Sequence, residues 1–169
     1  MNLHSGMTPV PVPSARFSSR PPLAWLRAPG SLTRHLVRVC PGSLVVEVLG
    51  EGWAKADPAS ARLLGLWGGA RVWRREVCLA CRHAGTWTPY VHAITLGSPA
   101  AQRRLGLARL GQRPLGLLLF RGGARRLELA ILPPGRSGPQ WARRSLFLLR
   151  GQHLVVWEAF LPGLPPFRR

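Results

Sequence analysis

One glutamate and one arginine lie inside apolar segments, where full charges are rare. Glu158 occupies the centre of the run LVVWEAFLP, residues 154–162, although the chain has only six acidic residues. Arg75 lies between Trp73 and Val77 in a second run, RVWRREVCL. Burying a charge is costly unless it is paired, hydrogen-bonded or neutralised. We therefore expect each charge either to have a fixed partner inside the fold or to belong to a ligand site.

The alternation of side chains along a strand places both charges on the apolar face of the sheet. Their neighbours on that face are Trp73, Val77 and Leu79 beside Arg75, and Leu154, Val156 and Phe160 beside Glu158. Two explanations are open. Arg75 and Glu158 could form a buried ion pair that links two strands. Alternatively, they line a pocket in which Arg75 binds a ligand carboxylate through its planar guanidinium and Glu158 meets a ligand hydroxyl or proton.

The composition favours a folded protein with an anionic partner. The hydrophobic content is 46%, and the net charge is +18, from 24 basic residues of which only Lys55 is a lysine. Such a charge suits nucleic acid, acidic lipid or an anionic metabolite. However, the arginines are scattered in ones and twos. We expect the pairs 103–104, 125–126 and 143–144 to lie on solvated faces, although one arginine of a pair could help to steer an anion. Without a zinc-finger spacing, an RNA-binding aromatic motif or a helix-turn-helix, we expect no nucleic-acid partner.

The cysteines and the other motifs point to no cofactor. Cys78 and Cys81 form a CxxC, but no second pair completes a zinc site. The motif also lies at the end of an expected strand, whereas redox-active CxxC motifs begin a helix. We expect Cys78 and Cys81 to be packing residues at a strand end of a cytoplasmic protein, because three cysteines make an incomplete disulfide set and no secretory signal is present. There is no GxSxG, Walker loop or GxGxxG, and no apolar run reaches the roughly 20 residues that span a membrane.

The expected elements alternate between short helices and strands. Capping residues Ser31, Asp57 and Ser98 begin three helices, of which the last ends at Gly111. Six strands are expected at residues 43–49, 70–79, 86–96, 125–132, 144–150 and 153–161. This order predicts a single α+β domain, an antiparallel β-sheet with helices packed on one face. We place a flexible Pro/Ser/Arg-rich leader at residues 1–22, the domain at 23–166 and a basic tail at 167–169.

Five segments in order resemble the signature segments of one family, the bacterial chorismate lyases (chorismate pyruvate-lyases). They span roughly residues 23–166 and read GSLTRHL, VWRREVCL, RLGQRPLGLLLF, WARRSLF and GQHLVVWEAFLP. The resemblance implies an enzyme that removes pyruvate from chorismate, leaves 4-hydroxybenzoate for ubiquinone biosynthesis and needs no metal or organic cofactor. It also implies an internal ligand cavity covered by helical flaps. We expect a monomer.

Matching motif to motif, the resemblance places the substrate- and product-binding residues at Leu32, Arg75, Leu115 and Glu158. Arg75 and Glu158 would be the catalytic residues, with Arg75 on the ring carboxylate and Glu158 at the hydroxyl end. Leu32 and Leu115 would form dry walls.

One segment departs from the family pattern. In WTPYVHAIT, Val91 stands where the family usually has an arginine near the site, and Thr95 replaces a proline. We considered His92 as a partial substitute for that arginine. Besides a lyase, three alternatives stay open: a degenerate, inactive lyase-like protein, a basic nucleic-acid-binding protein, and a non-catalytic small-molecule sensor. The last is an alternative because ligand-binding domains of some bacterial regulators resemble chorismate lyases in fold.

Overall fold

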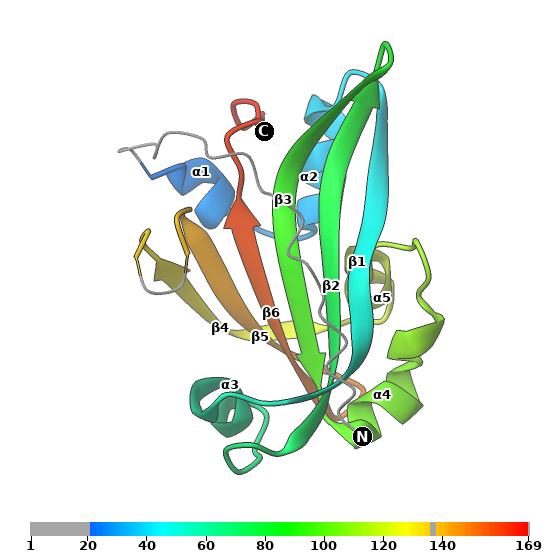
Figure 1. Ribbon diagram of the computed structural model, residues 1–169, viewed down its shortest axis with the longest axis vertical. Helices are drawn as coiled ribbons and strands as arrows, with labels where there is room; N and C mark the ends of the chain where they lie inside the picture. The colour runs from blue at the N-terminus through cyan, green and yellow to red at the C-terminus, as the bar shows by residue number, and fades with distance from the viewer. Residues whose placement is uncertain (1–20, 136–137, 169) are drawn as a thin grey trace, which may run out of the picture.

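Six antiparallel strands form one sheet that carries most of the site (Figure 1). The computed structural model describes residues 21–135 and 138–168. The strands lie in the order β1-β2-β3-β6-β5-β4. Their bounds are β1 Ser43–Lys55, β2 Arg71–His83, β3 Thr86–Gly97, β4 Arg125–Leu132, β5 Ala142–Leu149 and β6 Gln152–Phe160. The last strand in the chain therefore lies inside the sheet, next to β3.

The register of the sheet confirms the face assigned to both charges. Arg75 on β2 lies opposite Thr95 on β3, and Glu158 on β6 lies opposite Ala93 on β3. Because directly opposite residues share a face, Arg75 and Glu158 lie on the same side of the sheet, separated by one strand. Their side chains therefore do not lie on adjacent strands.

Two strands run further than their sequence pattern predicts. β1 continues past Gly50 to Lys55 through a register shift between Val48 and Gly50, which keeps its pairing with β2 intact. β2 continues to His83, where a tight turn leads into β3. That turn has positive φ at Ala84 (47°) and Gly85 (76°). Glycine adopts that conformation at little cost, so Gly85 makes the hairpin possible.

Three of the short helices begin at the predicted caps. The helices are α1 Leu23–Leu26, α2 Leu32–Val39, α3 Pro58–Leu63, α4 Pro99–Leu105 and α5 Leu115–Arg121, with a 3₁₀ turn η1 at Leu107–Arg109. Ser31, Asp57 and Ser98 each accept a backbone N–H bond at the start of α2, α3 and α4. α4 ends at Gly106, which has a left-handed conformation, and not at Gly111 as predicted.

The helices α1, α2, α4 and α5 cover the sheet face that carries Arg75 and Glu158. Trp25 of α1 and Leu36 of α2 join one core cluster on this face, and Leu105 of α4 and Leu119 of α5 join a second. The exception is α3, whose Ala61 packs on the opposite face in a third cluster. More helices therefore cover the sheet face that bears Arg75 and Glu158 than cover the opposite face. No helix in the described part of the chain is long and apolar enough to cross a membrane.

A disulfide corrects the prediction that Cys81 is only a packing residue. Cys40, directly after α2, is bonded to Cys81 on β2, with the two Cα atoms 5.6 Å apart. Cys78 is a free, buried thiol, and burial, followed by the charge of Glu47, raises its pKa to about 11. The pairing was missed because its partners are 41 residues apart and meet only when α2 packs beside β2. The disulfide therefore ties one end of α2 to the sheet.

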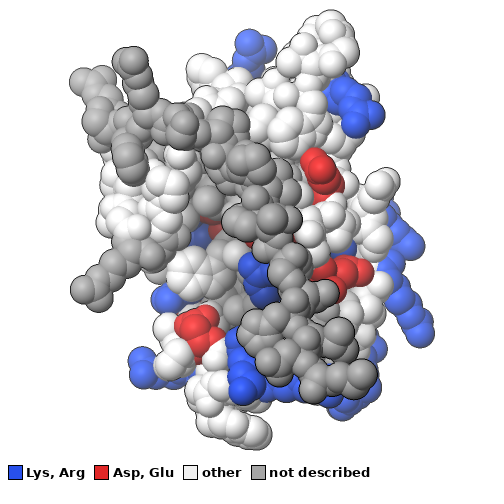
Figure 2. All heavy atoms as spheres, viewed as in Figure 1, with Lys and Arg blue, Asp and Glu red and all other residues white. Residues whose placement is uncertain are grey.

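The basic residues are distributed over the molecule. Figure 2 shows Lys and Arg side chains in several separate places on one face, with acidic side chains between them. This distribution agrees with the scattering of arginines along the sequence.

Candidate functional site

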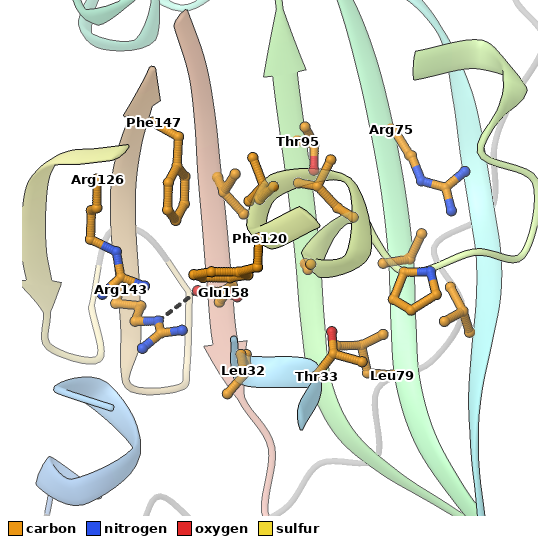
Figure 3. Close-up of a pocket in the computed structure, with 18 of the residues that line it drawn as sticks. Leu32, Thr33, Arg75, Leu79, Thr95, Phe120, Arg126, Arg143, Phe147 and Glu158 are labelled. Atoms are coloured by element: carbon orange, nitrogen blue, oxygen red, sulfur yellow. Dashed lines mark hydrogen bonds and ion pairs between the residues drawn. The ribbon is translucent and has the colours of Figure 1, made fainter. Parts of the chain in front are cut away.

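A cavity lies between the sheet and the first turns of α2 and α5, and all four residues selected from the sequence line it (Figure 3). Leu32 and Leu115 are the first residues of the two helices, and Arg75 and Glu158 come from β2 and β6. The strand pattern and the segment match thus converge on one site.

Arg75 is fixed by a neighbour that the sequence did not single out. Its side chain is nearly inaccessible, with 2% exposure, and its Nη1 donates to Glu51 Oε2 at 3.0 Å. Its Nη2 donates to the backbone oxygens of Gly111 at 2.7 Å and Arg113 at 3.3 Å, in the segment that leads into α5. The carboxylate that pairs with Arg75 is therefore Glu51. The alternative of a direct Arg75–Glu158 ion pair is wrong.

Glu158 is paired with Arg143. Arg143 Nε donates to Glu158 Oε2 at 2.5 Å, and the two residues lie opposite each other on β5 and β6. Arg143 Nη1 also donates to the backbone oxygens of Trp25, Leu26 and Ala28, at and after the end of α1. With 1% exposure, Arg143 is fully buried, so its expected place on a solvated face is wrong.

The strand pattern contained the signal for Arg143. Within WARRSLF, Arg143 alternates in step with Ser145 and Phe147, which are both buried, whereas Arg144 points to the other face. There Arg144 pairs with the exposed Glu128 at 2.9 Å. Only one arginine of this pair is solvated.

Arg126 is a second arginine that lines the cavity, contrary to its expected solvated position. It comes from β4, opposite Phe147, and its guanidinium carbon lies 5.2 Å from the centre of the Phe147 ring. Burial lowers the pKa of Arg126, and the charge of Arg143 lowers it further, while Glu158 acts in the opposite direction. Its Nε is buried with no hydrogen-bond partner among the residues that the structure describes.

The cavity therefore has two cationic ends with apolar walls between them. Figure 3 shows Arg75 on one side, Arg126 and Arg143 on the other, and Glu158 next to Arg143. β2 and β6 are separated by β3, and two strand spacings amount to about 10 Å. This arrangement suits a small molecule with an apolar ring and two separated anionic groups. Within the described residues, no group of three or more His, Cys, Asp or Glu side chains is placed to hold a metal.

The two leucines belong to helix ends that touch each other above the cavity. A Cβ on Gly116, the second residue of α5, would lie 2.8 Å from Thr33 Oγ1 and 3.1 Å from Ser31 Oγ at the start of α2. Only glycine permits this close approach. The free space inside is about 50 Å³, enough for roughly four water molecules.

The segment that departs from the family pattern is split between the two faces. Val91 is buried in the core with Leu79 and Phe160, and Thr95 lines the cavity. His92 lies on the opposite face, where its Nε2 is 2.6 Å from Glu76 Oε1. The suggestion that His92 substitutes for the missing arginine is therefore wrong. Burial raises the pKa of Glu76, but hydrogen bonds from Arg74 and His92 outweigh burial and leave it below its ordinary value.

Two solved structures have a similar fold. The ligand-binding domain of a putative GntR-family transcriptional regulator from Bordetella bronchiseptica superposes with a TM-score of 0.53 at 19% identity, covering 75% of this chain and 90% of that domain. The PhnF C-terminal domain gives 0.53 at 16% identity, covering 73% and 86%. At these identities the likeness shows the fold alone.

Sequence comparison goes further than fold. A probable chorismate pyruvate-lyase of Pseudomonas putida is 38% identical over 156 residues, covering 86% of this chain and 82% of the relative. One from Methylococcus capsulatus is 36% identical, covering 83% and 94%. The chorismate pyruvate-lyase of Cronobacter sakazakii is 34% identical, covering 85% and 82%. The family described as Chorismate lyase matches residues 12–167. The chain therefore belongs to the chorismate lyase family.

Proposed function

We propose that this protein is a chorismate pyruvate-lyase, which converts chorismate to 4-hydroxybenzoate and pyruvate. The observation that carries the proposal is the convergence of Arg75, Glu158, Leu32 and Leu115 on one cavity in a chain of this family. Chorismate has two carboxylates, one on the ring and one on the enolpyruvyl ether. The two cationic ends of the cavity match those charges.

The reaction needs little covalent help from the protein. The ether C–O bond breaks, the ring carbon that bears the hydroxyl loses its proton, and the ring becomes aromatic. The departing enolpyruvate takes up a proton and becomes pyruvate. Aromatisation supplies the driving force, so the protein has to hold the dianion, stabilise charge on the departing oxygen and assist proton movement.

Arg75 is the proposed clamp for the ring carboxylate, which survives into the product. Its bonds to Glu51 and to the two backbone oxygens hold its guanidinium in place before substrate binds. A guanidinium has further N–H groups that can meet a carboxylate. Preorganisation of this kind lowers the cost of binding.

Glu158 is proposed to act at the hydroxyl end of the ring. The bond from Arg143 goes to Oε2 of Glu158, which leaves Oε1 available to the ligand. That oxygen can accept a hydrogen bond from the substrate hydroxyl, and the carboxylate can take part in proton transfer. Leu32 and Leu115 exclude water above the ring.

The setting of the enzyme is part of the proposal. We infer a monomer that acts in the cytoplasm, without a nucleic-acid partner, and supplies 4-hydroxybenzoate for ubiquinone biosynthesis. Register shifts in both edge strands, at Val48/Gly50 in β1 and Arg126/Glu128 in β4, support the monomer, because bulges discourage pairing between sheet edges. Light scattering on the eluting protein measures the oligomeric state.

Product analysis tests the proposed activity. Purified protein mixed with chorismate should release pyruvate and 4-hydroxybenzoate in equal amounts, well above the spontaneous background. Binding of 4-hydroxybenzoate without any turnover would instead support the sensor or the inactive lyase-like protein.

A further inference from the structure

The cavity end at Glu158 carries more positive charge than its own carboxylate can neutralise. Arg75, at the other end, is paired with Glu51. Near Glu158, the single carboxylate is paired with Arg143, and Arg126 lines the same end of the cavity. The guanidinium of Arg126 therefore has no carboxylate from the described residues to pair with at this end of the cavity, and a ligand anion would neutralise its charge.

Arg126 differs from the other two cavity arginines in its partners. Arg75 donates to one carboxylate and two backbone oxygens, and Arg143 donates to Glu158 and three backbone oxygens. Arg126 packs against the ring of Phe147, and its buried Nε has no acceptor among the described residues. A buried donor without an acceptor costs free energy, and an acceptor that arrives with the ligand would remove this cost. Burial, followed by the charge of Arg143, lowers the pKa of Arg126, and the opposing effect of Glu158 does not offset them.

We propose that Arg126 is a specificity residue that binds the second carboxylate of the substrate, the one on the enolpyruvyl group that leaves as pyruvate. This inference rests on the proposed function. Arg75 lies on the other side of the cavity and would hold the ring carboxylate, as Figure 3 illustrates. Arg143 is unsuited to this role, because its Nε and Nη1 already serve Glu158 and the end of α1.

If Arg126 has this role, it contributes to the binding of the substrate but not to the binding of the product. 4-Hydroxybenzoate retains only the ring carboxylate, so it makes no contact with Arg126. Chorismate makes both contacts. A residue that merely supports the fold of the cavity would affect the binding of both molecules, whereas Arg126 should affect only the dianion.

The first test compares Arg126→Gln with Arg126→Lys and with Arg125→Gln, an exposed neighbour on the same strand. Arg126→Gln should raise KM for chorismate about tenfold or more, through loss of a charge-assisted bond, and leave the dissociation constant of 4-hydroxybenzoate within about twofold. Arg126→Lys, which keeps the charge without the planar fork, should recover part of the loss. Arg125→Gln should match the wild type. Equal weakening for substrate and product, or no change for either, would overturn the proposal.

A second test does not depend on turnover. It uses 3-(carboxymethoxy)benzoate, a stable dicarboxylate with an ether meta to the ring carboxylate, and 3-methoxybenzoate, which lacks the second carboxylate. Calorimetry should show that the wild type prefers the dicarboxylate and that Arg126→Gln loses this preference. A preference that persists in Arg126→Gln, or that is absent in the wild type, contradicts the role of Arg126. If the preference behaves as expected but chorismate is not cleaved, the proposed activity fails while the anion site stands.

Discussion

Glu158 has one oxygen held by Arg143, and its other oxygen is the one we assign to the substrate hydroxyl. Glu158→Gln retains the shape of the side chain but removes its charge and basicity. We expect kcat to fall by about 10²- to 10⁴-fold, the usual contribution of a general base, while 4-hydroxybenzoate binds within a few-fold of the wild type. Steady-state kinetics and product titration measure the two quantities.

A matched control for this substitution exists on the same sheet. Glu128 pairs with Arg144 at 2.9 Å on the exposed face, away from the cavity. Glu128→Gln should leave turnover unchanged, and thermal melting of both variants shows whether either loses stability. An unchanged kcat in Glu158→Gln would rule out proton transfer through this residue.

The position of each charge was predictable, but its partner was not. Alternation along a single strand is a local property, and it placed Arg75 and Glu158 on the cavity face correctly. Pairing depends on register between strands. Without the shift between Val48 and Gly50, Gly50 rather than Glu51 would lie opposite Arg75. No local sequence signal sets that shift, so Glu51 was missed.

At the scale of the elements, α2 and α5 are held together by Gly116. Gly116→Ala places a methyl group 2.8 Å from Thr33 Oγ1, too close for normal contact, so either the Thr33 side chain or the helix ends must shift. We expect 4-hydroxybenzoate to bind about tenfold or more weakly, because roughly 1–3 kcal/mol of overpacking falls on the cover of the cavity. Calorimetry measures the affinity.

The control for Gly116→Ala is Leu117→Ala, on the same helix but with an exposed side chain. It should bind product like the wild type. Wild-type affinity in Gly116→Ala would show that the contact between the two helices does not shape the site.

The disulfide is a second tie on α2. In the chain-entropy description, a bridge across about 40 residues stabilises the fold by about 4 kcal/mol. Cys81→Ser should therefore lower the free energy of unfolding of the oxidised protein by a few kcal/mol, measured by urea titration. Cys78 should not replace Cys81 as the partner of Cys40, because the pKa of the Cys78 thiol is about 11 and keeps it protonated.

Reduction of the wild type provides the matched comparison. We proposed that the protein acts in the cytoplasm, where thiols are kept reduced. The fully reduced protein then represents the form expected there. Reductant should destabilise the wild type but leave Cys81→Ser unchanged. Equal stability of oxidised wild type and Cys81→Ser would contradict a structural role for the bond.

Helices with clear caps were predictable, and those without were missed. Ser31, Asp57 and Ser98 marked α2, α3 and α4. α5 begins after Pro114 with no side-chain cap, and its sequence LGLLLFR has no polar stripe, so nothing local distinguishes it from a strand. α1 has only four residues and depends on packing against the sheet. The missed α1 also hid the carbonyl groups that bind Arg143.

For the molecule as a whole, the fold alone does not separate an enzyme from a sensor. The fold is shared with the ligand-binding domain of a putative GntR-family transcriptional regulator. Fold class and the four cavity residues were predictable, because strand order and segment order are readable from the sequence. Strand alternation also contained the signal for Arg143, whereas the place of Arg126 in the cavity depends on tertiary contacts.

The most direct test of the central claim is the activity of Arg75→Ala beside the wild type, with chorismate as substrate. The wild type should form pyruvate and 4-hydroxybenzoate in equal amounts. Arg75→Ala should lose about 100-fold or more in kcat/KM and a similar factor in product affinity, since two charge-assisted bonds of about 1.5 kcal/mol each would be missing. Near-normal turnover and product binding in Arg75→Ala would contradict the assignment of this cavity as the active site.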